Sequence, residues 1–153
     1  MSDDEYRIVV VSDDHGHTGT LLEIAEREMP FDLLIHCGDS EEDLFAFFAD
    51  ADFEVAAVAG NMDWYPYPQE LLLEAAGKRI FVCHGHRYGV KYTNEHLKAA
   101  AMSHKADIVL YGHTHRAEEE YENGVIFFNP GSTSYTYGGR VNTYGTICIR
   151  EYT

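Results

Sequence analysis

The chain has 153 residues, and we expect residues 1–153 to form one domain. Apolar residues make up 45% of the chain, which is normal for a globular protein and excludes a disordered one. The 26 acidic and 11 basic residues give a formal net charge of −15, which disfavours nucleic acid as a partner because such binding relies on Lys and Arg.

The first half of the chain alternates between strand and helix patterns. Residues 6–12 are an apolar, β-branched run, typical of a strand covered on both faces. Residues 18–28 have helical spacing, and residues 32–36 form the next apolar run. A second helix over 41–49 and a third strand over 53–58 follow. This order indicates a parallel sheet with helical crossovers.

The second half of the chain contains two hairpin patterns. One surrounds Gly77-Lys78 and the other surrounds Asn123-Gly124, a strong signal for a two-residue hairpin turn. Parallel units followed by hairpins indicate two sheets packed face to face, with helices outside. The expected elements are strands 71–75 and 79–84, a helix over 94–103, and strands 108–111, 117–122, 125–128 and 144–151.

Polar clusters follow the predicted strands at the ends where sites form in open α/β sheets. Asp13 and His15 are two residues apart, so on an extended chain they face the same side and can converge on one ion. His113 and His115 have the same spacing. The five clusters occupy residues 12–16, 38–40, 60–63, 84–86 and 112–115, and a further polar stretch covers 129–132.

Three further residues complete a candidate set of metal ligands. The carboxylate of Asp39 can bridge two ions, Asn61 offers an amide oxygen, and His84 offers an imidazole nitrogen. Mixed oxygen and nitrogen ligands suit manganese, iron, zinc or nickel better than calcium. Each motif is weak by itself, since a single Asp-x-His is more often a cap or a turn. Polar clusters at five strand ends together predict a metal centre.

The ordered motifs resemble those of the calcineurin-like metallophosphoesterases. They are Asp13-x-His15, Gly38-Asp39, Gly60-Asn61, His84-Gly85-His86 and Gly112-His113-Thr114-His115. The later Asn129-Pro130-Gly131-Ser132 and the small size resemble the compact prokaryotic phosphodiesterase branch, which is related to a retromer subunit that serves as a protein-binding scaffold.

This resemblance implies an α/β fold, a four-layer α/β/β/α sandwich of two mixed sheets flanked by helices. It also implies two divalent metal ions that share Asp39, with manganese expected first. One ion would bind Asp13, His15, Asp39 and His115, and the other would bind Asp39, Asn61, His84 and His113.

The expected reaction is hydrolysis of a phosphate ester, with a phosphodiester as the first candidate. Two adjacent metal ions can hold a bridging hydroxide that attacks phosphorus, and Asp39 would take part as the shared ligand. The ions would also supply the positive field that this acidic chain lacks. We expect the substrate to be a small phosphate ester.

One position departs from the family pattern. Many members have a histidine directly after the asparagine, placed to protonate the leaving oxygen, whereas this chain has Met62. Such acid catalysis is commonly worth about 10²–10⁴-fold, so we predict a preference for good leaving groups. His86 is the candidate substitute acid, and the alternative is that it supports the site through a hydrogen bond.

Other functions stay open at this point. A catalytically silent scaffold can lose ligands without penalty, so the presence of all seven candidates favours an enzyme. The choice between a phosphomonoesterase and a phosphodiesterase stays open, and the acidic charge disfavours a nuclease. The aromatic residues in 64–68 wall the substrate pocket, contact another subunit of a homo-oligomer, or take part in structural packing, which is the more common role of such residues.

Some further residues are candidates for supporting roles. Asp63 lies beside a candidate ligand and either supports it or caps a helix. Ser132 and residues 135–137 are candidates to border the pocket.

The cellular location is inferred from the cysteines and the start of the chain. Cys37, Cys83 and Cys148 are odd in number and widely spaced, as expected for free thiols in a reducing compartment. The start is acidic, unlike a secretory signal, and no apolar run is long enough to cross a bilayer. We therefore expect a cytoplasmic protein with no membrane partner.

Overall fold

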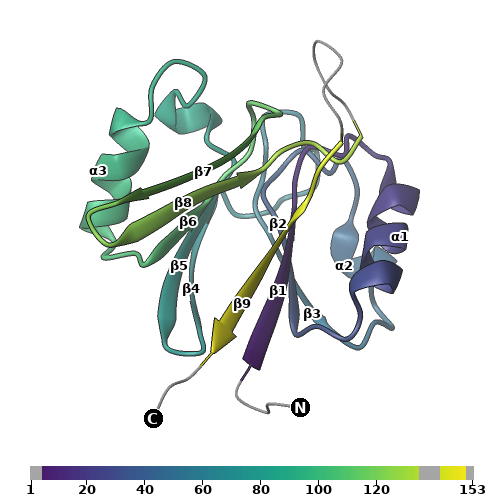
Figure 1. The fold of residues 1–153 in the computed structure, drawn as a ribbon. Helices are drawn as coiled ribbons and strands as arrows, with labels where there is room; N and C mark the ends of the chain where they lie inside the picture. The colour runs from purple at the N-terminus through teal and green to yellow at the C-terminus, as the bar shows by residue number, and fades with distance from the viewer. Residues whose placement is uncertain (1–4, 135–141, 151–153) are drawn as a thin grey trace.

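Two β-sheets pack face to face, and helices cover the outer face of each (Figure 1). The computed structural model describes residues 5–134 and 142–150. One sheet has the strand order β3-β2-β1-β9 and the other the order β4-β5-β6-β8-β7. Helices α1 and α2 lie outside the first sheet, and α3 lies outside the second. The predicted four-layer sandwich of two mixed sheets is confirmed.

The element bounds agree with most of the predicted ranges. The first sheet and its helices are β1 (Glu5–Val11), α1 (Thr18–Glu28), β2 (Leu33–His36), α2 (Leu44–Phe47), β3 (Glu54–Ala57) and β9 (Gly145–Arg150). The second sheet and its helices are β4 (Glu70–Ala75), β5 (Lys78–Cys83), the 3₁₀ turn η1 (His86–Tyr88), α3 (Glu95–Ser103), β6 (Ile108–Leu110), β7 (Ala117–Glu122) and β8 (Val125–Pro130). None of the helices in the described ranges is long and apolar enough to cross a membrane.

Alternation along the strands fills the spaces between the layers. In β1, Ile8 and Val10 belong to the core between the sheets, whereas Val9 and Val11 pack under α1 and α2. A third apolar cluster, which includes Phe81 of β5, lies between the second sheet and α3. Successive strand residues point to opposite faces, so a continuous apolar run serves a strand that is covered on both sides.

The predicted helix over 41–49 is wrong in its length, because α2 contains only residues 44–47. Asp43 caps it, with its carboxylate accepting a hydrogen bond from the Ala46 N–H at 3.3 Å. Glu41 has a φ of 56°, which a right-handed helix does not allow. Its N–H donates to the Asp63 carboxylate at 2.7 Å, so a tertiary contact overrides the helical pattern.

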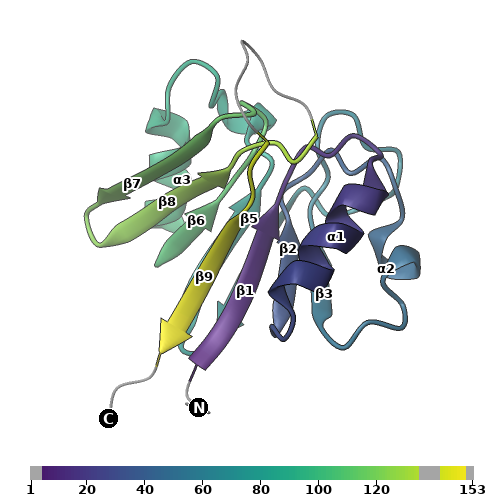
Figure 2. The same cartoon turned by 45° about the vertical axis from the view of Figure 1, so that its right-hand side comes forward.

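Parallel strands bring six loops to one edge of the sandwich. Strands β1, β2 and β3 run parallel in one sheet, and β5, β6 and β8 run parallel in the other. The start of β1 and the end of β9 lie at the opposite edge, and β1 rises from there toward the loops (Figure 2). The edge reached by the carboxyl ends of these strands, called the carboxyl edge below, carries the predicted polar clusters.

Candidate metal centre

Hydrogen bonds join the loops of the carboxyl edge across both sheets. The Asp13 N–H donates to the Gly38 carbonyl at 3.0 Å, and the His15 N–H donates to the Asp39 carbonyl at 2.9 Å. The His113 N–H donates to Oδ2 of Asp13 at 3.1 Å, which connects the second sheet to the first. The loops that carry these predicted ligands therefore form one connected unit.

The carboxylate of Asp13 lies at the centre of this unit and is fully buried. Its Oδ2 accepts a hydrogen bond from the Ser12 hydroxyl at 2.5 Å, while its Oδ1 has no hydrogen-bond partner among the described residues. Three imidazole nitrogens surround Oδ1: Nε2 of His115 at 3.3 Å, of His84 at 3.6 Å and of His15 at 3.9 Å. A buried charged oxygen without a partner is costly, and a cation among these nitrogens would satisfy it.

The ligand atoms gather into two groups, each with atoms within 4.8 Å of one another. One group is Asp13, His15 and His115, and the other is Asp13, Asp39 and His84. The geometry therefore places Asp13 in both groups, whereas the resemblance implied that Asp39 is shared. Oδ2 of Asp39 lies 3.2 Å from Nε2 of His84.

Hydrogen bonds set which nitrogen of two imidazoles faces the centre. His84 donates from Nδ1 to the Cys37 carbonyl at 2.7 Å, and His15 donates from Nδ1 to the Glu41 carboxylate at 2.8 Å. A carbonyl oxygen can only accept, so the proton of a neutral His84 is on Nδ1 and its Nε2 is left for a ligand. This outer hydrogen bond is usual for histidines that bind metals. Nδ1 of His113 lies 3.2 Å from Nε2 of His84.

The ionisation of these groups favours a cation at the centre. Burial raises the pKa of Asp39, but the hydrogen bond and charge of His84 outweigh it and lower that pKa to about 2. Burial acts to lower the pKa of His84, yet Asp39 and Asp13 raise it overall. Burial and the charges of His84 and Lys91 lower the pKa of His113 to about 4. The carboxylates thus stay ionised, and a positive charge is stabilised between them.

The backbone is strained where it presents the predicted ligands. Six non-glycine residues of this edge have a left-handed backbone, a conformation that costs of order 1–3 kcal/mol at each residue. Five of them are predicted ligands, and the sixth is the His15 partner Glu41. They are Asp13 (φ 56°), His15 (48°), Asp39 (61°), Glu41 (56°), His113 (72°) and His115 (62°).

Two glycines allow the loops to approach each other. A Cβ on Gly60 would lie 2.1 Å from Oδ1 of Asp39, and a Cβ on Gly112 would lie 2.1 Å from the Ser12 hydroxyl oxygen. A side chain at Gly60 would displace the Asp39 carboxylate, and a side chain at Gly112 would displace the Ser12 hydroxyl that donates to Asp13. The glycines that precede Asn61 and His113 are therefore required by the close approach of the neighbouring loops.

A pocket of about 370 Å³ opens over the centre. Asn61 is exposed and lines it, as do His15, Asp39, His113 and His115. The structure thus brings Asn61 to the same pocket as four of the other six candidates, whereas Asp13 and His84 are not among its lining residues. Met62, at the position of the missing histidine, also lines the pocket and is 56% exposed. A methionine there offers no proton.

His86 is half-buried beside the centre but does not line this pocket. Its ring centroid lies 5.4 Å from that of His84 and 6.0 Å from that of His113. Its Nδ1 is buried and has no hydrogen-bond partner among the described residues. Burial and the charge of His84 lower the pKa of His86. His86 thus lies beside the candidate ligands, and its role as an acid or as a support stays a prediction.

Outer contacts of the site went unpredicted or were only suspected from the sequence. Glu41 and Ser12 were missed, although both stand within two residues of a predicted ligand. Asp63 was suspected as a supporting residue, and its carboxylate accepts N–H bonds from Asp39 at 2.9 Å and from Gly60 and Glu41 at 2.7 Å. Ser132 donates its hydroxyl to the Asp13 carbonyl at 2.8 Å, whereas residues 135–137, suspected of bordering the pocket, lie outside the described residues.

A buried pair, Asp14 and His36, also ties two of these loops together. His36 donates from Nε2 to the Asp14 carboxylate, and its Nδ1 accepts the Gly38 N–H at 3.0 Å. Both side chains are fully buried. Asp14 stands between the candidate ligands Asp13 and His15, so its hydrogen bond to His36 connects them to the loop that carries Asp39.

Comparisons with known sequences show the family of this chain. The sequence model of the calcineurin-like phosphoesterase superfamily domain matches residues 6–151. A Bacillus subtilis protein named "Probable metallophosphoesterase YsnB" is 36% identical over 146 residues, which cover 94% of this chain and 85% of the relative. The Escherichia coli protein named "Phosphodiesterase YfcE" is 35% identical over 105 residues, which cover 61% of this chain and 52% of that protein.

Solved structures share the fold. A Streptococcus pneumoniae protein described as a predicted phosphoesterase is 31% identical, with a TM-score of 0.84 over 97% of this chain and 85% of its own. Vacuolar Protein Sorting 29 from Cryptosporidium parvum has a TM-score of 0.79 at 16% identity, over 97% of this chain and 87% of its own, and so shares the fold alone. The chain belongs to the calcineurin-like phosphoesterase superfamily.

Proposed function

We propose that this protein is a metal-dependent phosphodiesterase that acts on small phosphate esters with two divalent cations. The observation that carries the proposal is the buried Oδ1 of Asp13, which has no hydrogen-bond partner among the described residues and faces three imidazole nitrogens. Manganese is the first candidate, and iron, zinc or nickel suit the same ligands. The net charge of −15 supports small esters rather than nucleic acid.

The seven predicted ligands would hold the two ions. Asp13, His15, Asp39 and His115 would bind one ion, and Asp39, Asn61, His84 and His113 the other. Asp39 would be shared by the two ions, and Asp13 belongs to both groups of ligand atoms that lie within 4.8 Å of one another. When bound, such ions lower the pKa of a water molecule and neutralise charge on phosphate oxygens.

The protein's own part is to hold the ligands in position before the substrate arrives. Glu41 orients His15, and the Cys37 carbonyl orients His84. Asp63 fixes the backbone of Asp39. Because these partners are already in place, little reorganisation is needed when the substrate binds.

The central test is hydrolysis of bis(para-nitrophenyl) phosphate with and without manganese. We expect metal-dependent turnover by the wild type and a loss of at least about a hundredfold in Asp39→Asn, which keeps the shape of the side chain but removes its charge. Asp107→Asn, which changes a carboxylate directly before β6, is the matched control. No metal-dependent turnover, together with unchanged metal binding in Asp39→Asn, would reject the proposal.

Comparing substrates tests the diester preference. The rate on the corresponding para-nitrophenyl monoester is measured under the same conditions. We expect the diester to react faster, and a faster monoester would make the protein a phosphomonoesterase with the same centre.

The absence of an acid at Met62 leads to a separate prediction for His86. Because His86 lies outside the pocket lining, we expect His86→Ala to lower kcat without changing how the rate depends on the leaving group. A series of aryl diesters of graded phenol pKa measures this dependence. A steeper dependence in the variant would make His86 the proton donor.

We also propose that the protein is located in the cytoplasm. Cys37 and Cys83 are buried free thiols, and Cys148 is an exposed one, which suits a reducing compartment. Fractionation of the native host cells tests this location.

A further inference from the structure

A second pocket, of about 570 Å³, adjoins the metal pocket. Its walls come from the segment that follows η1, from the start of α3 and from β7. Lys91 lines both pockets, and Thr114, which stands between His113 and His115, lines the second. A substrate held at the metal centre can therefore extend past Lys91 into this second space.

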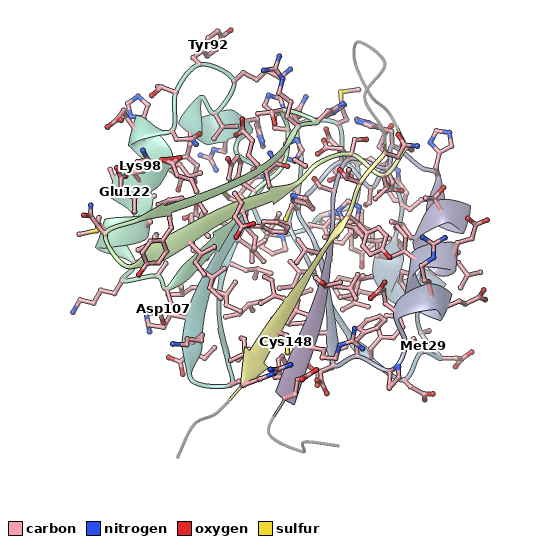
Figure 3. All side chains as sticks on the ribbon, viewed as in Figure 1. Met29, Tyr92, Lys98, Asp107, Glu122 and Cys148 are labelled. Carbon is pink, nitrogen blue, oxygen red and sulfur yellow. The ribbon has the colours of Figure 1, made fainter. Side chains whose placement is uncertain are left out.

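Some of the charges in the second pocket are already paired. Lys98 of α3 lies 2.9 Å from the Glu120 carboxylate and 3.1 Å from that of Glu122, and Figure 3 shows Lys98 and Glu122 beside each other. Glu118 accepts a hydrogen bond from the Tyr111 hydroxyl at 3.1 Å. The charge of Lys98 is therefore neutralised by two carboxylates, whereas Glu118 keeps its negative charge because the tyrosine hydroxyl that donates to it is neutral.

Lys91 and Arg116 remain available. Both are exposed, and neither forms an ion pair within the residues that the structure describes. Arg116 directly follows His115, and its N–H donates to the Thr114 hydroxyl at 3.1 Å, which fixes its backbone beside the metal pocket. The last charged residue of the pocket, Glu95, lies in the first turn of α3, where the helix dipole stabilises a carboxylate.

An aromatic side chain stands at the same pocket. Tyr92 lines it and is 92% exposed, and its ring projects from the loop above α3 in Figure 3. An uncovered ring of this kind can stack on an aromatic part of a ligand. Cationic groups and an exposed ring thus lie on the same side of the metal centre.

We propose that the second pocket is a substrate subsite that binds an additional anionic group, a phosphate or a carboxylate, on the ester arm next to the scissile phosphate. Lys91 and Arg116 are its specificity-determining residues. The inference rests on the proposed phosphodiesterase function and narrows the substrate to small diesters that carry further negative charge. Such a charge finds two cations here in a chain of net charge −15.

The test compares substrates with the same leaving group. The first pair is thymidine 5′-(para-nitrophenyl phosphate) with and without a 3′-phosphate. The second is para-nitrophenyl phenyl phosphate with and without a carboxylate on the phenyl ring, which shows whether a carboxylate is accepted in place of a phosphate. In the wild type we expect kcat/KM to be about tenfold higher for the anionic member, the effect of one charge-assisted hydrogen bond.

Variants then assign this preference to residues. Arg116→Gln and Lys91→Gln are each expected to bring the anionic-to-neutral ratio of kcat/KM close to one, and Arg116→Lys to keep most of it. The matched control is Lys78→Gln, an exposed cation at the start of β5, which should leave the ratio unchanged. A wild-type ratio near one for both pairs, or a ratio unaffected by both Gln variants, overturns the subsite.

The two proposals fail in different ways. If the wild type hydrolyses neither member of a pair with manganese, the phosphodiesterase function fails. If it hydrolyses both equally, only the subsite fails. Calorimetric binding of thymidine 3′,5′-bisphosphate and thymidine 5′-phosphate tests the subsite without turnover. We expect about tenfold tighter binding of the bisphosphate, lost in Arg116→Gln, and equal affinities in the wild type overturn it.

Discussion

The two edges of the sandwich use the left-handed backbone conformation for different purposes. At the edge opposite the site, the described residues with this conformation are Ala76, Lys105 and Asn123, apart from glycines. Ala76 and Asn123 are each followed by a glycine in the same conformation, as a two-residue hairpin turn requires. There, the conformation closes a turn.

At the carboxyl edge, the same conformation aims side chains. Asp13, His15 and Asp39 carry chemical groups that no turn needs, and they adopt positive φ values although glycine would do so at lower cost. The strain therefore lies where the candidate ligands converge. This difference indicates that the left-handed conformation serves a functional site at the carboxyl edge and serves the turns between strands at the opposite edge.

The largest effect on the carboxyl edge is expected when one strained ligand loses the side chain that orients it. Glu41→Ala deletes the carboxylate that accepts from Nδ1 of His15, so we expect manganese affinity to fall about 10–100-fold. Calorimetric titration measures this loss. Glu41→Gln keeps an acceptor and should restore most of the affinity, and Glu42→Ala is the control for lost charge. Equal affinities in Glu41→Ala and the wild type would contradict the role of Glu41.

A smaller effect should come from pH. The pKa of His84 is raised above 6.5 by Asp39 and Asp13, so a proton occupies its Nε2 at low pH and must leave before an ion binds. Manganese affinity should therefore fall as the pH drops through that raised pKa, by up to about tenfold per pH unit for one competing proton. Titration at several pH values measures the slope, and His96→Gln, an exposed position on α3, is the control. An affinity that is independent of pH below the usual histidine range would refute this competition.

The smallest effect concerns the opposite edge. Lys105 follows α3 with a φ of 54°, and its side chain takes part in no ion pair within the described residues. Lys105→Gly should stabilise the fold by about 0.5–1 kcal/mol, because relief of the left-handed strain exceeds the entropy cost of glycine. Urea unfolding measures the change, and activity should stay at the wild-type level. If Lys105→Gly destabilised the fold or lowered activity, the left-handed residue at the opposite edge would have a role beyond closing a turn, and the difference between the two edges would be contradicted.

Much of the fold could be predicted because its signals are local. Apolar runs predicted β1, β2 and β6, and the Asn123-Gly124 dipeptide predicted the β7–β8 hairpin. The candidate ligands could be found because each follows a strand and the parallel strands end at one edge. Spacing within a few residues was enough for these predictions.

The parts that sequence did not predict depend on contacts between distant segments. The start of α2 is displaced because Glu41 donates to Asp63, 22 residues further along the chain. Lys91 reaches the metal pocket after η1, a turn bounded by the left-handed glycines Gly85 and Gly89. No local pattern shows where such a segment ends in space. The proposed subsite beside the centre therefore depends on contacts between distant segments that the sequence does not show.

The most direct test of the central claim is a crystal structure grown with manganese, with anomalous scattering measured at the manganese absorption edge. We predict two anomalous peaks at the carboxyl edge, one beside Asp13, His15 and His115 and one beside Asn61, His84 and His113, with Asp39 contacting both. Calorimetry on the same protein should give two ions per chain. The absence of anomalous density among these residues at saturating manganese would contradict the account.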